Sequence, residues 1–304
     1  MRRGVVLMLV AAATMVDGSE TGGTAAGPES LRGTLVFACS GCPMKPGGPA
    51  LYFVAASGGD LRRHPTTLTP YSPRWSPMGR HVAIMHRFSR IAVLPVPGGS
   101  GRLLTNPCNE CAQDPAWSPD GRRIAYMNRG RLFTMRSNGT RERLLLARPK
   151  RSLSAPDWSP DGQQIAFDDR GQELYVVRSD GTRVRRLGRV KGRYPRWSPS
   201  GRWIAFVGFT RRGAALMIVR SDGTHPRFLV SGLPIDINSS PSWSPDGRHV
   251  AFTLVRENED YDGHQLMAAA LDGSPPQPVV IPELPPTAYS ELYGVDWTSR
   301  ALSS

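Results

Sequence analysis

Short apolar runs recur along this chain, each lying between two polar turns. One set, at residues 124–126, 165–167, 204–207 and 250–254, follows a Trp-Ser-Pro turn. A second set, at 132–135, 174–177, 216–219 and 266–270, ends in Asn-Gly or Asp-Gly. β-Branched and aromatic residues favour strands, whereas Asn-Gly and Asp-Gly favour hairpin turns. The pattern therefore predicts an all-β protein.

The strand pattern repeats with a tryptophan as its marker. The marker residues are spaced 42, 41, 39, 46 and 54 apart, at Trp75, Trp117, Trp158, Trp197, Trp243 and Trp297. A unit of about 40 residues built only of strands and turns has the length of a four-stranded propeller blade. The chain enters its first unit at Thr34 without a tryptophan strand, so we expect the strand around Trp297 to complete that sheet. The sequence thus predicts a six-bladed β-propeller, closed by its C-terminal strand.

The repeated phrases also resemble a known family. WSPDGRRIAY from Trp117, WSPDGQQIAF from Trp158, LYVV from Leu174 and DGTRVRRL from Asp180 are similar to the TolB-type, WD40-like β-propeller repeat. The resemblance covers residues 33–299 and implies the propeller fold. Related propellers occur in envelope systems, before hydrolase domains and as exported proteins, so the resemblance leaves function open. We expect a stand-alone propeller, without the domain that precedes the TolB propeller and without a peptidase domain.

The first residues of the chain predict that the protein is exported. Two arginines at the start and a short apolar segment after them are typical of a signal peptide, which we assign to residues 1–18. Residues 19–32, rich in Gly, Thr, Ser and Ala, are expected to form a flexible linker, and 300–304 a C-terminal tail. The protein is therefore expected to be secreted or periplasmic, in the cell envelope. An uncleaved N-terminal anchor is the alternative.

The net charge is +13, which raises the question of a nucleic-acid partner. Many of the arginines fall in or beside the expected outermost strands, where charge discourages edge-to-edge pairing. We interpret these arginines as a solvated rim spread around the ring. We expect weak association with anionic envelope surfaces and no binding of nucleic acid. A monomer is expected.

Four cysteines form two C-x-x-C pairs, Cys39/Cys42 and Cys108/Cys111. In propeller topology all four should lie in loops on one face, on neighbouring blades. With an export signal and an even count, disulfides are the favoured interpretation, within each pair or between loops. A zinc site with four thiolates and a thioredoxin-like redox role are the alternatives.

The residues just before the tryptophans should lie near the central channel. They include two expected pairs of opposite charge on neighbouring blades, Asp296 with Arg74 and Asp157 with Arg196. These four residues either staple the blades together as ion pairs or line a funnel that binds a ligand. Tyr71, Tyr194 and Tyr293 are expected on the loop-bearing face beside the funnel.

Motifs for catalysis are absent from the sequence: it contains no G-x-S-x-G, H-E-x-x-H or phosphate-loop motif. An acidic loop with Glu257, Asp260 and Asp262 is an alternative calcium site, but no metal or cofactor is favoured. Asp120, Asp161 and Asp246 are expected to form turns. The sequence thus predicts a non-enzymatic, exported propeller that binds a protein or peptide of the cell envelope. The alternative is a hydrolase or lyase that acts on extracellular polysaccharide or peptide from the funnel.

Overall fold

A computed structural model describes residues 31–40, 50–59, 61–87, 89–106, 112–148, 151–170, 172–258, 261–279 and 291–299. These residues form β-strands joined by turns, and none of them is in an α-helix. Nor does this part of the chain contain a helix long and apolar enough to span a membrane. The all-β prediction is confirmed. The expected signal peptide, residues 1–18, lies outside the described residues.

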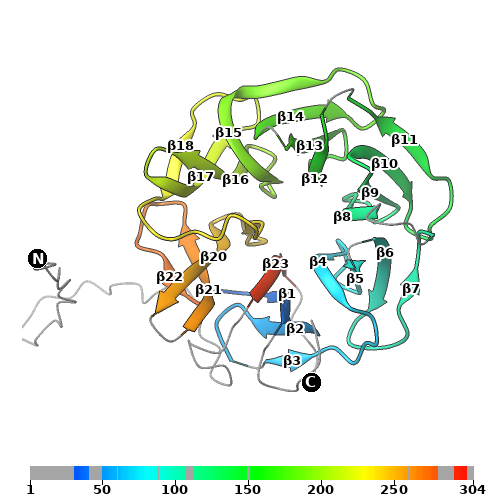
Figure 1. The fold of residues 1–304 in the computed structure, drawn as a ribbon, viewed down its shortest axis with the longest axis horizontal. Coiled ribbons are helices and arrows are strands. Elements are labelled where there is room, and N and C mark those ends of the chain that lie inside the picture. Colours follow the sequence, from blue (N-terminus) through cyan, green and yellow to red (C-terminus); the bar gives the residue numbers. More distant parts are fainter. Residues whose placement is uncertain are drawn as a thin grey trace, which may run out of the picture. The chain divides into compact units, whose positions relative to one another are not determined.

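The strands form antiparallel sheets, most of them four-stranded (Figure 1). The first sheet has the order β23 (Glu291–Thr298), β1 (Thr34–Ser40), β2 (Ala50–Ala55) and β3 (Arg62–Arg63). The second contains β4 (Pro70–Trp75), β5 (His81–His86), β6 (Arg90–Pro95) and β7 (Arg102–Leu103). The third contains β8 (Ala112–Trp117), β9 (Arg123–Asn128), β10 (Arg131–Arg136) and β11 (Arg143–Leu146).

The next sheet has seven strands, and a four-stranded sheet follows it. The seven are β12 (Leu153–Trp158), β13 (Gln164–Asp169), β14 (Glu173–Arg178), β15 (Arg185–Trp197), β16 (Trp203–Thr210), β17 (Gly213–Arg220) and β18 (Arg227–Val230). The last sheet contains β19 (Ser242–Trp243), β20 (His249–Asn258), β21 (Tyr261–Ala270) and β22 (Gln277–Pro278).

The tryptophan-bearing strands surround a common axis. Strands β23, β4, β8, β12, β15 and β19 contact one another in that order, and β19 contacts β23 again. Within residues 31–299 the sheets therefore follow one another around a ring (Figure 1). The ring closes as predicted, because β23 pairs with β1 and places Trp297 opposite Leu35. Distant segments of the chain thus share one sheet, which leaves no long unpaired edge at the closure.

The core lies between adjacent sheets, and the tryptophans belong to it. Trp75 contacts Phe53 of the preceding sheet, with ring centroids 5.2 Å apart. Trp117, Trp243 and Trp297 each donate their indole N–H to a backbone carbonyl, those of Arg74, Arg196 and Arg32, at 3.2, 2.9 and 2.8 Å. These three bonds fix the orientation of their rings, whereas the indole nitrogens of Trp75, Trp158 and Trp197 are buried without a hydrogen-bond partner among the described residues. The tryptophans point between sheets, which leaves the residues before them to face the axis.

Two strands depart from the pattern of the others. Strand β3 contains only Arg62 and Arg63, because Pro65 cannot donate to a β-ladder. Strand β15 does not end within its own unit but continues without a turn to Trp197. Gly188 allows this path at φ 63°: a Cβ there would lie 2.4 Å from the carbonyl oxygen of Gly223.

The cysteine prediction needs one correction. Cys39 does not lie in a loop: it is buried within β1 and pairs with Ala50 of β2. The side chains of β1 point alternately to the two faces of the first sheet. Both faces are covered, so the strand stays buried as far as Cys39. Cys42, Cys108 and Cys111 lie outside the described residues, so the disulfide stays a prediction.

Candidate functional site

A repeated backbone irregularity builds the wall of the central channel. In β4, β8, β12 and β15 the register shifts between the fourth and the first residue before the tryptophan. A residue with positive φ occupies each shift, with φ of 45° at Ser72, 51° at Asp114, 49° at Ala155 and 57° at Tyr194. A bulge of this kind re-aims the neighbouring side chains. It turns the residue before each tryptophan toward the axis.

Sequence reasoning missed this bulge, although a signal for it was present. A proline lies two residues before five of the six tryptophans, as in Pro73 and Pro115. Because proline has no N–H, it is confined within sheets to edges, strand starts and bulges. A proline that recurs inside an innermost strand therefore indicates a bulge.

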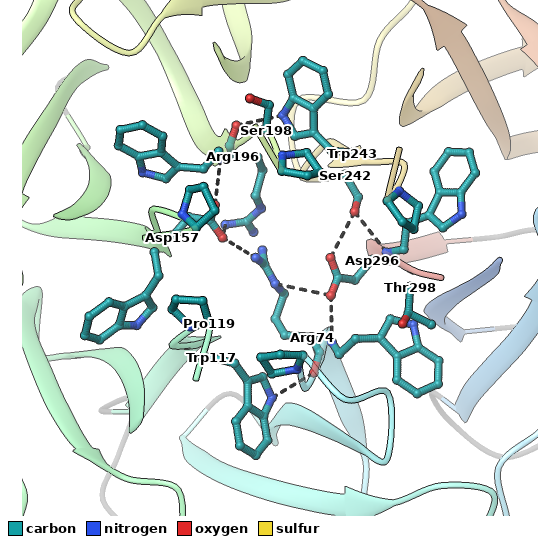
Figure 2. Close-up of a pocket in the computed structure, with 18 of the residues that line it drawn as sticks. Arg74, Trp117, Pro119, Asp157, Arg196, Ser198, Ser242, Trp243, Asp296 and Thr298 are labelled. Carbon is teal, nitrogen blue, oxygen red and sulfur yellow. Dashed lines mark hydrogen bonds and ion pairs between the residues drawn. The ribbon is translucent and has the colours of Figure 1, made fainter. Parts of the chain in front are cut away.

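Four charged residues meet at the axis, and we call them the axial quartet: Arg74, Asp157, Arg196 and Asp296. Asp296 lies 3.7 Å from Arg74, and Asp157 lies 3.7 Å from Arg196, which are the two predicted neighbour pairs. Arg74 also forms an ion pair with Asp157 across the channel. Figure 2 shows both guanidinium groups converging on the centre, with a carboxylate on either side. The predicted pairs are thus joined into one network.

The carboxylates of the quartet also hold the backbone of the inner strands. Asp157 accepts a hydrogen bond from the backbone N–H of Trp197 at 2.8 Å, and Asp296 accepts one from that of Trp75 at 2.7 Å. Ser242 donates its hydroxyl to Asp296 at 3.0 Å and accepts from the N–H of Trp297 at 3.0 Å. Asp296 therefore links strands of different sheets, and Asp157 links the first and fourth strands of the seven-stranded sheet, as expected for staples of the ring.

The electrostatics of the two arginines differ. Burial and the neighbouring Arg74 guanidinium lower the pKa of Arg196 to about 10, despite the nearby carboxylates. Burial also lowers the pKa of Arg74, but the carboxylates of Asp296 and Asp157 outweigh it and raise that pKa above its usual value. Both side chains are charged at neutral pH. Among the described residues, Arg74 Nη1 and Arg196 Nε are buried without a hydrogen-bond partner.

A pocket opens at each end of the inner strands. The turn-face pocket, of about 350 Å³, lies where the Trp-Ser-Pro segments gather, and the axial quartet lines it (Figure 2). The loop-face pocket, of about 290 Å³, lies where the same strands begin. It is lined among others by Tyr71, Gln113, Asp114, Arg193, Tyr194, Arg196, Asn238 and Ser240. Arg196 lines both pockets and therefore lies between them.

The predicted tyrosines and acidic residues have mixed outcomes. Tyr71 and Tyr194 are brought together in the loop-face pocket, where Arg193 stacks over the Tyr194 ring at 4.9 Å. The side chain of Tyr293 lies outside the described residues, as do Asp260 and the side chains of Glu257 and Asp262. In the part of the chain that the structure describes, no three His, Cys, Asp or Glu residues are grouped so as to hold a metal.

The aspartates of the Trp-Ser-Pro turns behave as predicted. Asp120 accepts a hydrogen bond from the Ser118 hydroxyl at 2.6 Å and from the backbone N–H of Arg122 at 3.0 Å. Asp161 and Asp246 make the corresponding bonds in their own turns. These carboxylates close turns and do not face the channel.

A buried acid beside the loop-face pocket was not predicted. Asp168, fully buried, accepts hydrogen bonds from the Ser154 hydroxyl and from the backbone N–H of Tyr194, the latter at 2.9 Å. Burial raises its pKa to about 7, against the effect of those two donors. An apolar strand that ends in two aspartates, Asp168 and Asp169, was the available sequence signal.

No protein-family model matches this sequence. No curated protein matches it either. Many solved structures share its fold, among them TolB from Acinetobacter baumannii, with a TM-score of 0.73 and 19% identity over 89% of this chain and 67% of the other. A putative TolB from Agrobacterium tumefaciens has a TM-score of 0.63 and 20% identity, covering 88% of this chain and 99% of the other.

Other kinds of protein share the fold as well. A chain of a nidogen/laminin complex has a TM-score of 0.68 and 14% identity, with coverage of 88% of this chain and 100% of the other. An oligogalacturonate lyase in complex with manganese has a TM-score of 0.52 and 15% identity, with coverage of 73% and 74%. At these sequence identities the similarity concerns the fold alone. This chain has the fold of a TolB-like β-propeller.

Proposed function

We propose that this chain is a non-enzymatic binding protein of the cell envelope that recognises a protein or peptide segment through the loop-face pocket and the channel behind it. The observation that carries the proposal is the composition of that pocket. Its lining combines aromatic rings, such as Tyr71 and Tyr194, with amide, carboxylate and guanidinium groups, and it draws them from several sheets. Such a mixture suits a peptide, which offers both apolar side chains and backbone hydrogen-bonding groups.

Six blades fit the strand pairing. The seven-stranded sheet divides at β15, which pairs with β14 through Arg185 and Arg186 and with β16 through Arg196 and Trp197. This division gives two blades that share the continuous strand β15. With the four separate sheets they make six blades, one for each marker tryptophan. We assign the propeller to residues 33–299 as a monomer, exported by a signal peptide over residues 1–18.

The axial quartet is proposed to be the structural floor of the binding channel. The carboxylates of Asp157 and Asp296 are already engaged by guanidinium groups and backbone N–H groups. They are therefore poorly available as a general acid or base, which needs a carboxyl within reach of substrate. This argues for binding rather than catalysis, although propeller lyases share the fold. For the lyase alternative, an activity screen on acidic oligosaccharides with divalent metals is the test.

The binding proposal is tested by capture from envelope extract. The tagged protein is compared with an Arg193→Ala/Asn238→Ala variant, which alters the loop-face pocket, and with an Arg183→Gln control, which alters an exposed residue outside it. The wild type and the control should retain the same partner, and the pocket variant should lose it while unfolding at an unchanged temperature. Equal retention by all three proteins would contradict the proposal.

A further inference from the structure

A second concave site lies away from the channel, on the third sheet. It is a groove of about 640 Å³ between the turn that joins β8 to β9 and the turn that joins β10 to β11. Its lining includes Arg122, Arg123, Arg136, Arg141 and Arg143, with Asp120 as the one carboxylate. We call it the arginine groove. Arg141 and Arg143, which were interpreted as part of a rim spread around the ring, are here gathered with three other arginines around one concavity.

The guanidinium groups of the groove are not neutralised by the protein. None of the five arginines forms an ion pair with a carboxylate of the described residues. Arg143 donates to the backbone carbonyl of Asp180 at 3.0 Å, and Arg123 lies over the Trp158 ring at 4.7 Å. Asp120 is occupied by its own turn, where the Ser118 hydroxyl lowers its pKa. The groove therefore carries an uncompensated positive charge.

The two turns that present these arginines are tied together by hydrogen bonds. The backbone N–H of Ser137 donates to the carbonyl of Arg122 at 2.9 Å, which connects one turn to the other. Within the second turn, Asn138 accepts from the backbone N–H of Thr140 at 3.0 Å. A site held on fixed turns loses less conformational entropy when a ligand binds.

Comparison with the other repeat units separates the arginines that recur in the repeat from those found only in the groove. Arg178, Arg183 and Arg185 occupy the positions that correspond to Arg136, Arg141 and Arg143, so arginines on this hairpin recur. The positions of Arg122 and Arg123, however, are taken by Gln163 and Gln164. In the other units the position of Arg122 is again an arginine, at Arg80, Arg202 and Arg248. The position of Arg123 is taken there by His81, Trp203 and His249. Two adjacent arginines at these positions are thus particular to the arginine groove.

We propose that the arginine groove binds a compact ligand that carries two or more phosphate groups, such as a phosphorylated sugar. Guanidinium groups bind phosphate through paired, charge-assisted hydrogen bonds. A volume of about 640 Å³ falls in the range of roughly 300–1,000 Å³ that is typical of small-molecule sites. A single phosphate could not contact five arginines on two turns, whereas a ligand with several phosphates can. This inference does not depend on the function proposed for the channel.

The test is titration calorimetry with inorganic tripolyphosphate at moderate ionic strength. Arg122→Gln/Arg123→Gln copies the neighbouring unit and should weaken binding at least about tenfold, because two charge-assisted contacts are lost. A second variant, Arg136→Gln/Arg141→Gln, changes two exposed side chains and should also lose affinity without loss of fold.

The matched control is Arg178→Gln/Arg183→Gln, which removes the same charge from the equivalent hairpin of the next unit. It should change the affinity less than about twofold, since neither side chain lines the groove and salt weakens the attraction of charges that do not contact the ligand. Vesicles whose headgroups carry two phosphates form a second arm, which distinguishes a lipid source from a free ligand. Saturable binding in either arm that only the groove variants weaken supports the proposal. No saturable binding in both arms, or equal weakening by the control, overturns it.

Discussion

Replacement of Asp157 by alanine should destabilise the ring more than any exposed charge change. The Asp157 side chain is about 10% exposed, pairs with Arg74 and Arg196, and accepts the backbone N–H of Trp197. Removing one partner of a buried charged network leaves the others uncompensated, which costs about 3–5 kcal/mol. For a domain of this size that corresponds to a melting temperature lower by roughly 10 °C.

The assay is urea unfolding monitored by tryptophan fluorescence, with thermal melts alongside. The matched control is Arg186→Gln, which removes an ion pair with Glu173 at 3.2 Å whose arginine is 41% exposed. Exposed pairs contribute at most about 1 kcal/mol, so the control should unfold almost as the wild type does.

A double-mutant cycle tests the mechanism itself. If Asp157→Ala leaves Arg196 as an uncompensated buried charge, adding Arg196→Ala should cost less than it does in the wild type, with a coupling of about 1–3 kcal/mol. Additive costs, or a loss below about 1 kcal/mol for Asp157→Ala alone, would refute the view that the quartet staples the sheets.

Three further predictions concern pH, ring closure and the cysteines. Asp168 has a pKa of about 7 in the fold but about 3.9 when unfolded, so the folded state holds its proton longer and stability falls as pH rises from about 4 to 7. Asp168→Asn should reduce the pH dependence of the free energy of unfolding, measured in urea titrations between these pH values. An unchanged pH dependence would mean that other groups cause it. Deletion from Val295 onward removes the partner of β1 and should abolish cooperative melting, whereas an unaltered melt would contradict closure. Peptide mapping of the unreduced exported protein should find the cysteines disulfide-linked, and free thiols or bound zinc would argue against this.

Sequence reasoning recovered the features that depend on local periodicity. The spacing of the tryptophans predicted the sheets and the pairing of Trp297 with the strand that begins at Thr34. The Asp-Gly steps predicted turns whose aspartates cap their own backbone, as Asp120 does. The charges before the tryptophans predicted neighbour pairs such as Asp296 with Arg74. All of these follow from residues a few positions apart, or from equivalent positions of adjacent repeats.

The tertiary structure decided what meets across the ring and between the turns. Arg74 reaches Asp157, which is not on the neighbouring sheet, because the bulges turn both side chains to the axis and closure sets the width of the channel. The arginine groove combines Arg122 with Arg141, which lie on two turns of one sheet. The repeat alone determines which residue types occupy each strand and turn. Distances between side chains on different strands arise only when register, bulges and ring closure are fixed together, so charge counts along the sequence could not reveal them.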